Sequence, residues 1–301
     1  MSSILTNNGA MVALQTLNNI NKNLGATQSA ISTGKAVSTA KDNAAVWSIS
    51  KTMESDVQGF KAISSSLSIG ESTVSVARSA AEGTTDLLKS MKEKIVAAQD
   101  GTVDRATLQT DIDALKAQIA SVVGSAQFNG VNLVNDSAEM TIDSTGGTTP
   151  DTKGIQVVSS LDRDNTGAVT ASRIGVKAVN LTTAALTGMA VDGTTAVTLD
   201  DIDVKTDDAS AADALAAIEG MIKMSTDAAA SFGSAQGRLS LQNEFVGKLS
   251  DSLKSGIGSL VDANMEETSA RLQALQVQQQ LGVQSLSIAN QAPQSILSLF
   301  R

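Results

Sequence analysis

The sequence predicts a mostly α-helical protein. Its N- and C-terminal segments form a long antiparallel helical bundle or coiled coil, and a small β-containing insert lies between them. Three observations carry this prediction. Proline, the strongest helix breaker, occurs only at Pro150 and Pro293. Apolar residues recur at alternating spacings of three and four in both long proline-free stretches. Between these stretches the composition shifts toward Thr, Gly, Asp and Val, as is typical of short strands and turns.

The first helical stretch begins near residue 10 and is interrupted at Gly34. Its apolar and amide side chains follow a heptad seam, as in helices that pack side by side. The seam consists of Ala10, Leu14, Leu17, Asn21, Leu24, Gln28 and Ile31.

A second, longer seam follows and keeps its register without a slip for about five heptads. Its members are Phe60, Ile63, Leu67, Gly70, Val74, Ala77, Ala81, Thr84, Leu88, Met91, Ile95 and Ala98. Asp100 and Gly101 signal a turn, and helical spacing resumes from Leu108 to Ala126. Such a short connection predicts an antiparallel helix pair.

From about residue 137 to 208 the segments Gly154–Val158 and Val197–Leu199 read as short strands. Helical spacing then returns from Leu215 to Leu253. The last helix carries one seam at Val261, Met265, Thr268, Leu272, Leu275, Gln279, Gly282, Leu286 and Ala289, and beside it a second stripe at Ala274, Val277, Leu281 and Ile288. Two stripes on one helix predict contacts from two sides, which favours an assembly of several helices.

Composition argues against several classes of function. The chain has no His, Cys or Tyr, so the commonest general acid/base, the thiolate nucleophile and the best zinc ligands are missing, and we expect neither an enzyme nor a cofactor. A net charge of −9 disfavours nucleic acid. We expect no membrane insertion, because no apolar run is long enough to span a bilayer, and no cleaved secretory signal, because the N-terminus lacks a basic and an apolar region. The calcium-like start at Asp162 is read as a polar turn, because Arg173 stands where the loop needs a Glu.

Three segments resemble the bacterial flagellin family. The run STGKAVSTAKDNAA at 32–45 resembles the family's SSGLRINSAKDDAAG, with Lys35 and Ala36 as departures, and QFNG at 127–130 matches the family's QFNG. The run ANQAPQSILSL at 289–299 is similar to the family's terminal ANQxPQxVLSL. Asn43 and Trp47 look like variants found in alphaproteobacterial members.

The resemblance implies a structural subunit of the flagellar filament that is secreted to the cell exterior through the type III export apparatus. Residues 1–33 and 259–301 would line the filament lumen, residues 34–136 and 207–258 would form the helical shell around it, and residues 137–206 would be a small surface-exposed variable domain. The implied partners are copies of the same chain, an export chaperone, and the hook-associated and cap proteins.

Helices that pack modestly within one chain need partners. We therefore expect the terminal seams to be covered mainly by neighbouring subunits, through Leu14, Leu17, Leu24, Ile31, Leu272, Leu275, Leu286 and Ile288. The Gln-rich run at 276–280 is either a set of amide contacts between subunits or a solvated helix face.

Family members sensed by the animal Toll-like receptor 5 carry a motif resembling LQRVREL on the first shell helix. The matching positions here include Leu88, Ser90, Lys92, Glu93 and Lys94. Ser90 and Lys92 replace two arginines whose planar donor forks they do not reproduce, so we expect a poor receptor agonist.

Two other classes stay open at this point. A hook–filament junction protein is also helical at both ends, although the motifs at 32–45 and 127–130 favour the filament subunit. A binding module, such as an adhesin or an export cargo, is the second alternative.

Overall fold

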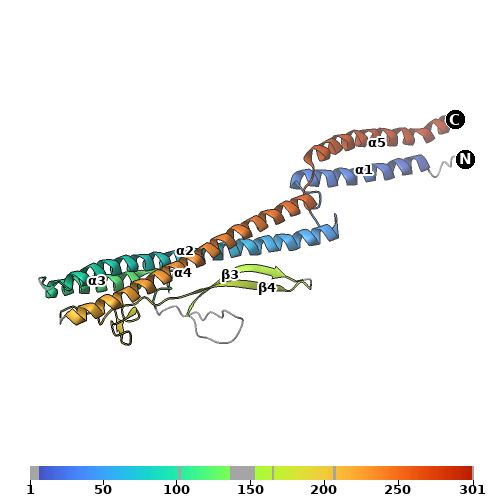
Figure 1. Cartoon of the computed structure of the whole chain (residues 1–301). Helices are drawn as coiled ribbons and strands as arrows, with labels where there is room; N and C mark the ends of the chain where they lie inside the picture. Colours follow the sequence, from blue (N-terminus) through green and yellow to red (C-terminus); the bar gives the residue numbers. More distant parts are fainter. Residues whose placement is uncertain (1–6, 101–102, 136–152, 165, 206–207, 300–301) are drawn as a thin grey trace. The chain divides into compact units, whose positions relative to one another are not determined.

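The computed structural model describes residues 7–100, 103–135, 153–164, 166–205 and 208–299 (Figure 1). Its helices are α1 (Asn8–Thr33), α2 (Ala44–Ala98), α3 (Arg105–Ser125), α4 (Asp208–Val261) and α5 (Met265–Leu299). The predicted mostly helical class is confirmed, and the chain divides into two compact units. Unit 1 combines residues 1–57 with 251–301, and unit 2 is residues 58–250.

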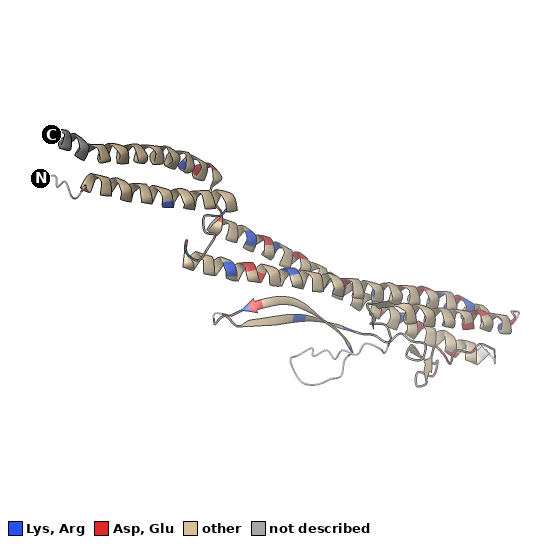
Figure 2. Ribbon diagram, turned by 180° about the vertical axis from the view of Figure 1, so that it is seen from behind, with Lys and Arg blue, Asp and Glu red and all other residues tan. Residues whose placement is uncertain are grey.

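Unit 1 is built around α1 and α5, which lie side by side and run in opposite directions (Figures 1 and 2). The two connecting segments that precede α2 and α5 pair with each other. The amide of Ala36 donates to the carbonyl of Val261 at 2.7 Å, and the amide of Ala263 donates to the carbonyl of Gly34 at 2.9 Å. This pairing brings the end of α1 and the start of α5 together, although Thr33 and Asn264 are 231 positions apart along the chain.

Side-chain caps set the helix boundaries in unit 1. Asn7 accepts a hydrogen bond from the amide of Ala10, and Asn264 accepts from the amide of Glu266. Each cap satisfies an amide that has no partner inside its helix. Gly34 ends α1 with a φ of +71°, the left-handed conformation that glycine adopts at low cost. The interruption predicted at Gly34 is therefore confirmed.

Unit 2 has its core between α2, α3 and α4, which lie alongside one another in both views (Figures 1 and 2). All twelve residues of the long predicted seam on α2, from Phe60 to Ala98, are buried. The facing part of α4 buries Ile218, Phe232 and Leu239 at regular spacings. A buried polar contact crosses this core: the Thr85 and Ser225 hydroxyls lie 3.0 Å apart, and each lies within hydrogen-bonding distance of the carbonyl of Ala81.

The strands form three separate two-stranded antiparallel sheets within the described residues: β1 (Gln127–Phe128) with β2 (Val131–Asn132), β3 (Gly154–Arg163) with β4 (Val169–Lys177), and β5 (Thr187–Met189) with β6 (Ala196–Thr198). The two strand segments predicted from sequence fall in β3 and β6. The turn between β1 and β2 places Asn129 and Gly130 at positive φ, as a tight hairpin requires.

The described part of the segment predicted as a variable domain, 137–206, belongs to unit 2. Small two-stranded sheets bury too little apolar surface to stand alone. Instead Leu181, Leu199 and Ile202 are buried within unit 2. Gln109 of α3 ties the segment down, because its side-chain oxygen accepts from the amide of Val204 at 2.9 Å. Residues 136–152 lie outside the described residues.

Candidate assembly surface

The seam predicted on the last helix is the face by which α5 meets α1. Leu275 is 7% exposed, and the other seam residues of α5 from Thr268 to Ala289 are all half-buried. Amide groups bridge the two helices at the middle of α1 and at its N-terminal end. Gln279 donates to the side-chain oxygen of Asn21 at 2.8 Å, and Asn7 donates to the carbonyl of Ala289 at 2.7 Å. At least one member of the Gln-rich run thus contacts α1 of its own chain.

Four of the seven residues in the seam predicted on α1 are buried or half-buried. The buried or half-buried residues of α1 are Ala10, Ala13, Leu17, Ile20, Leu24, Thr27, Ala30 and Ile31. Leu14, Asn21 and Gln28 of the predicted seam are exposed. The observed face buries Ile20 and Thr27 in place of two amides, and the Thr27 hydroxyl bonds to the carbonyl of Asn23 at 2.8 Å, so no polar group is left without a partner by this choice.

The eight predicted interface residues divide into two groups. Leu17, Leu24, Ile31, Leu272, Leu275 and Leu286 are covered at least in part within one chain, and Leu14 and Ile288 are exposed. Leu275 is already covered within the single chain, and coverage of the other seven residues by neighbouring subunits stays a prediction. The pairing of α1 with α5 covers Leu275, and the spacing within one helix does not identify that partner.

The second stripe predicted on α5 is exposed along its whole length. Val277, Leu281 and Ile288 belong to it, and Ile288 is 62% exposed. On α1 the residues Met11, Val12 and Leu14 are also exposed. A contiguous apolar patch on a folded surface marks an interaction site.

The same helices lack charge over most of their length. Residues 1–21 and 272–300 contain no Asp, Glu, Lys or Arg, although the chain has 53 such residues, 22 basic and 31 acidic. Ribbons coloured by charge show the described parts of α1 and α5 almost free of blue and red, in contrast with the long helices (Figure 2). Depletion of charge is a property of the centres of protein–protein interfaces.

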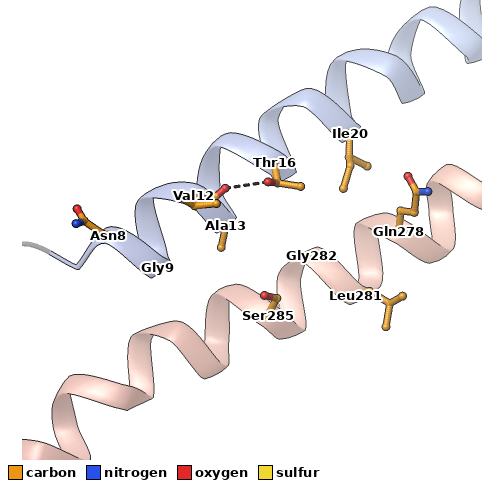
Figure 3. Close-up of a pocket in the computed structure, with 10 residues that line it drawn as sticks. All are labelled: Asn8, Gly9, Val12, Ala13, Thr16, Ile20, Gln278, Leu281, Gly282 and Ser285. Carbon is orange, nitrogen blue, oxygen red and sulfur yellow. Dashed lines mark hydrogen bonds between the residues drawn. The ribbon is translucent and has the colours of Figure 1, made fainter. Parts of the chain in front are cut away.

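A groove runs along one flank of the α1–α5 pair near the ends of the chain (Figure 3). Its volume is about 720 Å³. Ala13 and Ile20 point from α1 toward α5, and Val12, Thr16, Leu281 and Ser285 complete the walls. The lining is apolar or uncharged throughout, so the groove suits uncharged, largely apolar side chains.

The receptor-motif positions lie on α2 in unit 2. Leu88 is fully buried in the core, whereas Ser90 and Glu93 are exposed. The two lysines are engaged in ion pairs with neighbouring helices: Lys92 with Glu219 of α4, and Lys94 with Asp111 of α3 at 2.7 Å. Lys94 therefore does not place a free charge on an apolar surface.

The described residues hold no cluster of three or more potential metal ligands. In the hairpin that joins β3 to β4, Asp164 accepts hydrogen bonds from the amides of Thr166 and Ala168 at 2.8 and 2.9 Å. These bonds lower the pKa of Asp164, with the Thr166 hydroxyl as the first cause. No helix in the described part of the chain has the length and hydropathy to cross a bilayer.

Comparison with known proteins places the chain in a class of proteins with helical N- and C-terminal regions. Residues 4–139 match the bacterial flagellin N-terminal helical region, and residues 215–300 match the bacterial flagellin C-terminal helical region. Flagellin FljK of Caulobacter vibrioides is 39% identical over 304 residues, covering 100% of this chain and 99% of the relative. The protein called flagellin in Brucella melitensis is 39% identical over 302 residues, and flagellin C of Rhizobium meliloti is 37% identical over 333, both covering 100% of each chain.

The chain belongs to the bacterial flagellin family. It is a structural subunit of the flagellar filament, the polymer that serves swimming motility. The family models and relatives above are all flagellins, so they favour the filament subunit over a hook–filament junction protein.

Proposed function

We propose that this chain is exported to the cell exterior and polymerises through its α1–α5 pair. The observation that carries the proposal is the exposed apolar surface on two terminal helices that lack charge at 1–21 and 272–300. Such a surface costs free energy in water and is covered in a stable state. In the polymer, residues 1–33 and 259–301 would line the lumen, residues 34–136 and 207–258 would form the shell, and residues 137–206 would face outward.

Limited proteolysis of monomer and filament tests this arrangement. Lys22 on α1 and Arg271 on α5 are exposed in the single chain, and so is Lys177 at the end of β4. Trypsin should cut the monomer at all three sites. After polymerisation, cleavage at Lys22 and Arg271 should fall sharply while cleavage at Lys177 continues. Equal cleavage of monomer and filament at Lys22 and Arg271 would show that the terminal helices are not the polymer contact.

The export route is a second part of the proposal. Residues 1–33 would act, while unfolded, as an uncleaved signal for the type III apparatus, with a chaperone holding the chain before export. Hook-associated and cap proteins would meet the ends of the filament. The protein in shed filaments should then begin at or near Ser2. A mature N-terminus inside α1 would contradict the uncleaved signal.

A further inference from the structure

The two flanks of the α1–α5 pair differ in shape. One flank holds the groove, whose walls include Val12 of α1 and Leu281 of α5. Leu14 and Val283 belong to neither the groove nor the contact between the two helices, and both are exposed, at 50% and 54%.

Helix geometry places the side chains of Leu14 and Val283 on the flank opposite the groove. Leu14 follows Val12 by two residues, and Val283 follows Leu281 by two. Residues that are two positions apart on an α-helix are rotated by about 200° from each other around the helix axis. Because α1 and α5 run antiparallel, both rotations lead away from the groove to the same opposite flank. Met11 is exposed beside Leu14 and extends the apolar ridge.

We propose that the groove of one copy receives the Met11, Leu14 and Val283 ridge of the next copy. The inference rests on the proposed polymerisation through the terminal helices and specifies how one copy contacts the next. Both surfaces lie within the uncharged segments, so neither would bury an unpaired charge on contact. The long apolar side chains of the ridge match the uncharged lining of the groove.

The arrangement explains why the contact would not stop at a dimer. A surface that binds a copy of itself gives a closed two-fold pair. A groove and a ridge on opposite flanks give a heterologous contact, in which each copy still offers a free groove or ridge after binding. Such contacts propagate into an open helical polymer when the rotation between copies does not close a ring.

Thiol cross-linking tests this contact directly, because the natural chain has no cysteine. The variant Leu14→Cys with Thr16→Cys carries one thiol on the ridge and one in the groove. A bridge between the two thiols of one copy leaves the mass of a single chain, so only bridges between copies can give larger species. Filaments of this variant are treated with a short bis-maleimide, which tolerates an axial offset between copies, and then denatured for gel electrophoresis.

A ladder of covalent trimers and larger species is the expected result, with the Leu14→Cys and Thr16→Cys single variants giving no ladder. Filaments without a ladder would overturn the groove–ridge contact. So would dimers from the Leu14→Cys single variant, since they would show that ridges meet each other. In both cases the trypsin protection at Lys22 and Arg271 would still report on polymerisation through the terminal helices, so the two proposals fail separately.

A second pair of variants keeps the test decisive if the double variant does not polymerise. Ser285→Leu fills the groove and leaves the ridge unchanged, and Ser285→Ala is the matched control that removes the hydroxyl without filling the space. The critical concentration for polymerisation should rise by about tenfold or more in Ser285→Leu and by less than about twofold in Ser285→Ala. Equal critical concentrations for the two variants would overturn the proposal.

Discussion

The two long helices of unit 2 and the two terminal helices of unit 1 follow the same three–four spacing but bury it to different extents. On α2 all twelve seam residues are buried, because α3, α4 and the segment from Leu181 to Val204 join the same unit. On α1 only Thr27 is fully buried, and α5 buries only Leu275 among its described side chains. A helical pair without a third element leaves half of each helix in water. The comparison shows that spacing identifies the face that packs, whereas the number of neighbouring elements decides how completely it is covered.

Truncation in the two regions should give the largest difference in monomer stability. Leu88→Ala removes a fully buried side chain of unit 2 and should lower the free energy of unfolding by about 2–5 kcal/mol. Leu24→Ala on the half-buried face of α1 should cost clearly less, because less apolar surface is lost. Urea unfolding of the monomer followed by circular dichroism measures both. Equal losses would contradict the distinction between the two regions.

A charge on the terminal helices should separate folding of the monomer from polymerisation. Ile288→Asp, on the exposed stripe, should change monomer stability by less than about 0.5 kcal/mol and abolish filaments, because the carboxylate would be desolvated in every copy of the polymer. Leu275→Asp should abolish filaments and also loosen α1 from α5, since Leu275 is buried in one chain. Seeded polymerisation seen by electron microscopy, together with monomer helicity, distinguishes the two variants.

Ser240→Asp is the control, because it adds the same charge at an exposed position of α4 in unit 2. It should leave both monomer and seeding nearly unchanged. If Ile288→Asp formed normal filaments, the exposed stripe would not be part of the polymer contact.

The contrast between the well-covered α2 and the partly covered α1 also explains how much of this fold could be predicted from the sequence. The long seam of α2 was predictable residue by residue, because five heptads of regular spacing are compatible with only one buried face of the helix. The seam of α1 was predictable only at Ala10, Leu17, Leu24 and Ile31. Leu14, Asn21 and Gln28 each stand next to the residue that is covered instead, which is Ala13, Ile20 or Thr27, and the pairing with α5 decides between the neighbours. Leu275 was predictable as a seam residue, but its partner within the same chain was not.

The groove could not be predicted, because its walls come from helices more than 250 residues apart in sequence, as Thr16 and Leu281 illustrate. The sequence did indicate an interaction surface on the terminal helices, because segments 1–21 and 272–300 are uncharged. For the central segment, composition predicted strands but could not show that Gln109 and its neighbours bind it to the helices.

Another prediction concerns recognition of the monomer by Toll-like receptor 5 through the motif positions on α2. The chain should be a poor agonist of Toll-like receptor 5, by about a hundredfold relative to a flagellin with the two arginines, because Ser90 offers no planar fork and Lys92 is paired with Glu219. A reporter-cell assay with purified monomer measures the potency. Ser90→Arg with Lys94→Leu should gain signalling, and Ser90→Ala is the matched control that should not. Equal potency of the natural chain and an arginine-bearing flagellin would refute this expectation.

The smallest effect concerns the loop between α1 and α2, which joins the sparsely covered helix to the long one. Asp42 accepts hydrogen bonds from the amide of Thr39 at 2.9 Å and the amide of Ser38 at 3.1 Å, and both hydroxyls also donate to it. The backbone bond from Thr39 is the first cause that lowers the pKa of Asp42 below its ordinary value of 3.8. Bonds to the charged form stabilise that form.

The sign of the pH dependence follows from the lowered pKa. The contribution of Asp42 to loop stability is fully present above the ordinary pKa of 3.8 and is lost as the pH falls through the lowered folded pKa. The loop should therefore keep its geometry at neutral pH and loosen only in acid. An NMR titration of the monomer should give a midpoint for Asp42 below 3.8, with the amide shifts of Ser38 and Thr39 following the same curve. Asp42→Asn should abolish that shared transition, whereas a midpoint at or above 3.8 in the natural chain would show that these four hydrogen bonds do not hold the carboxylate in solution.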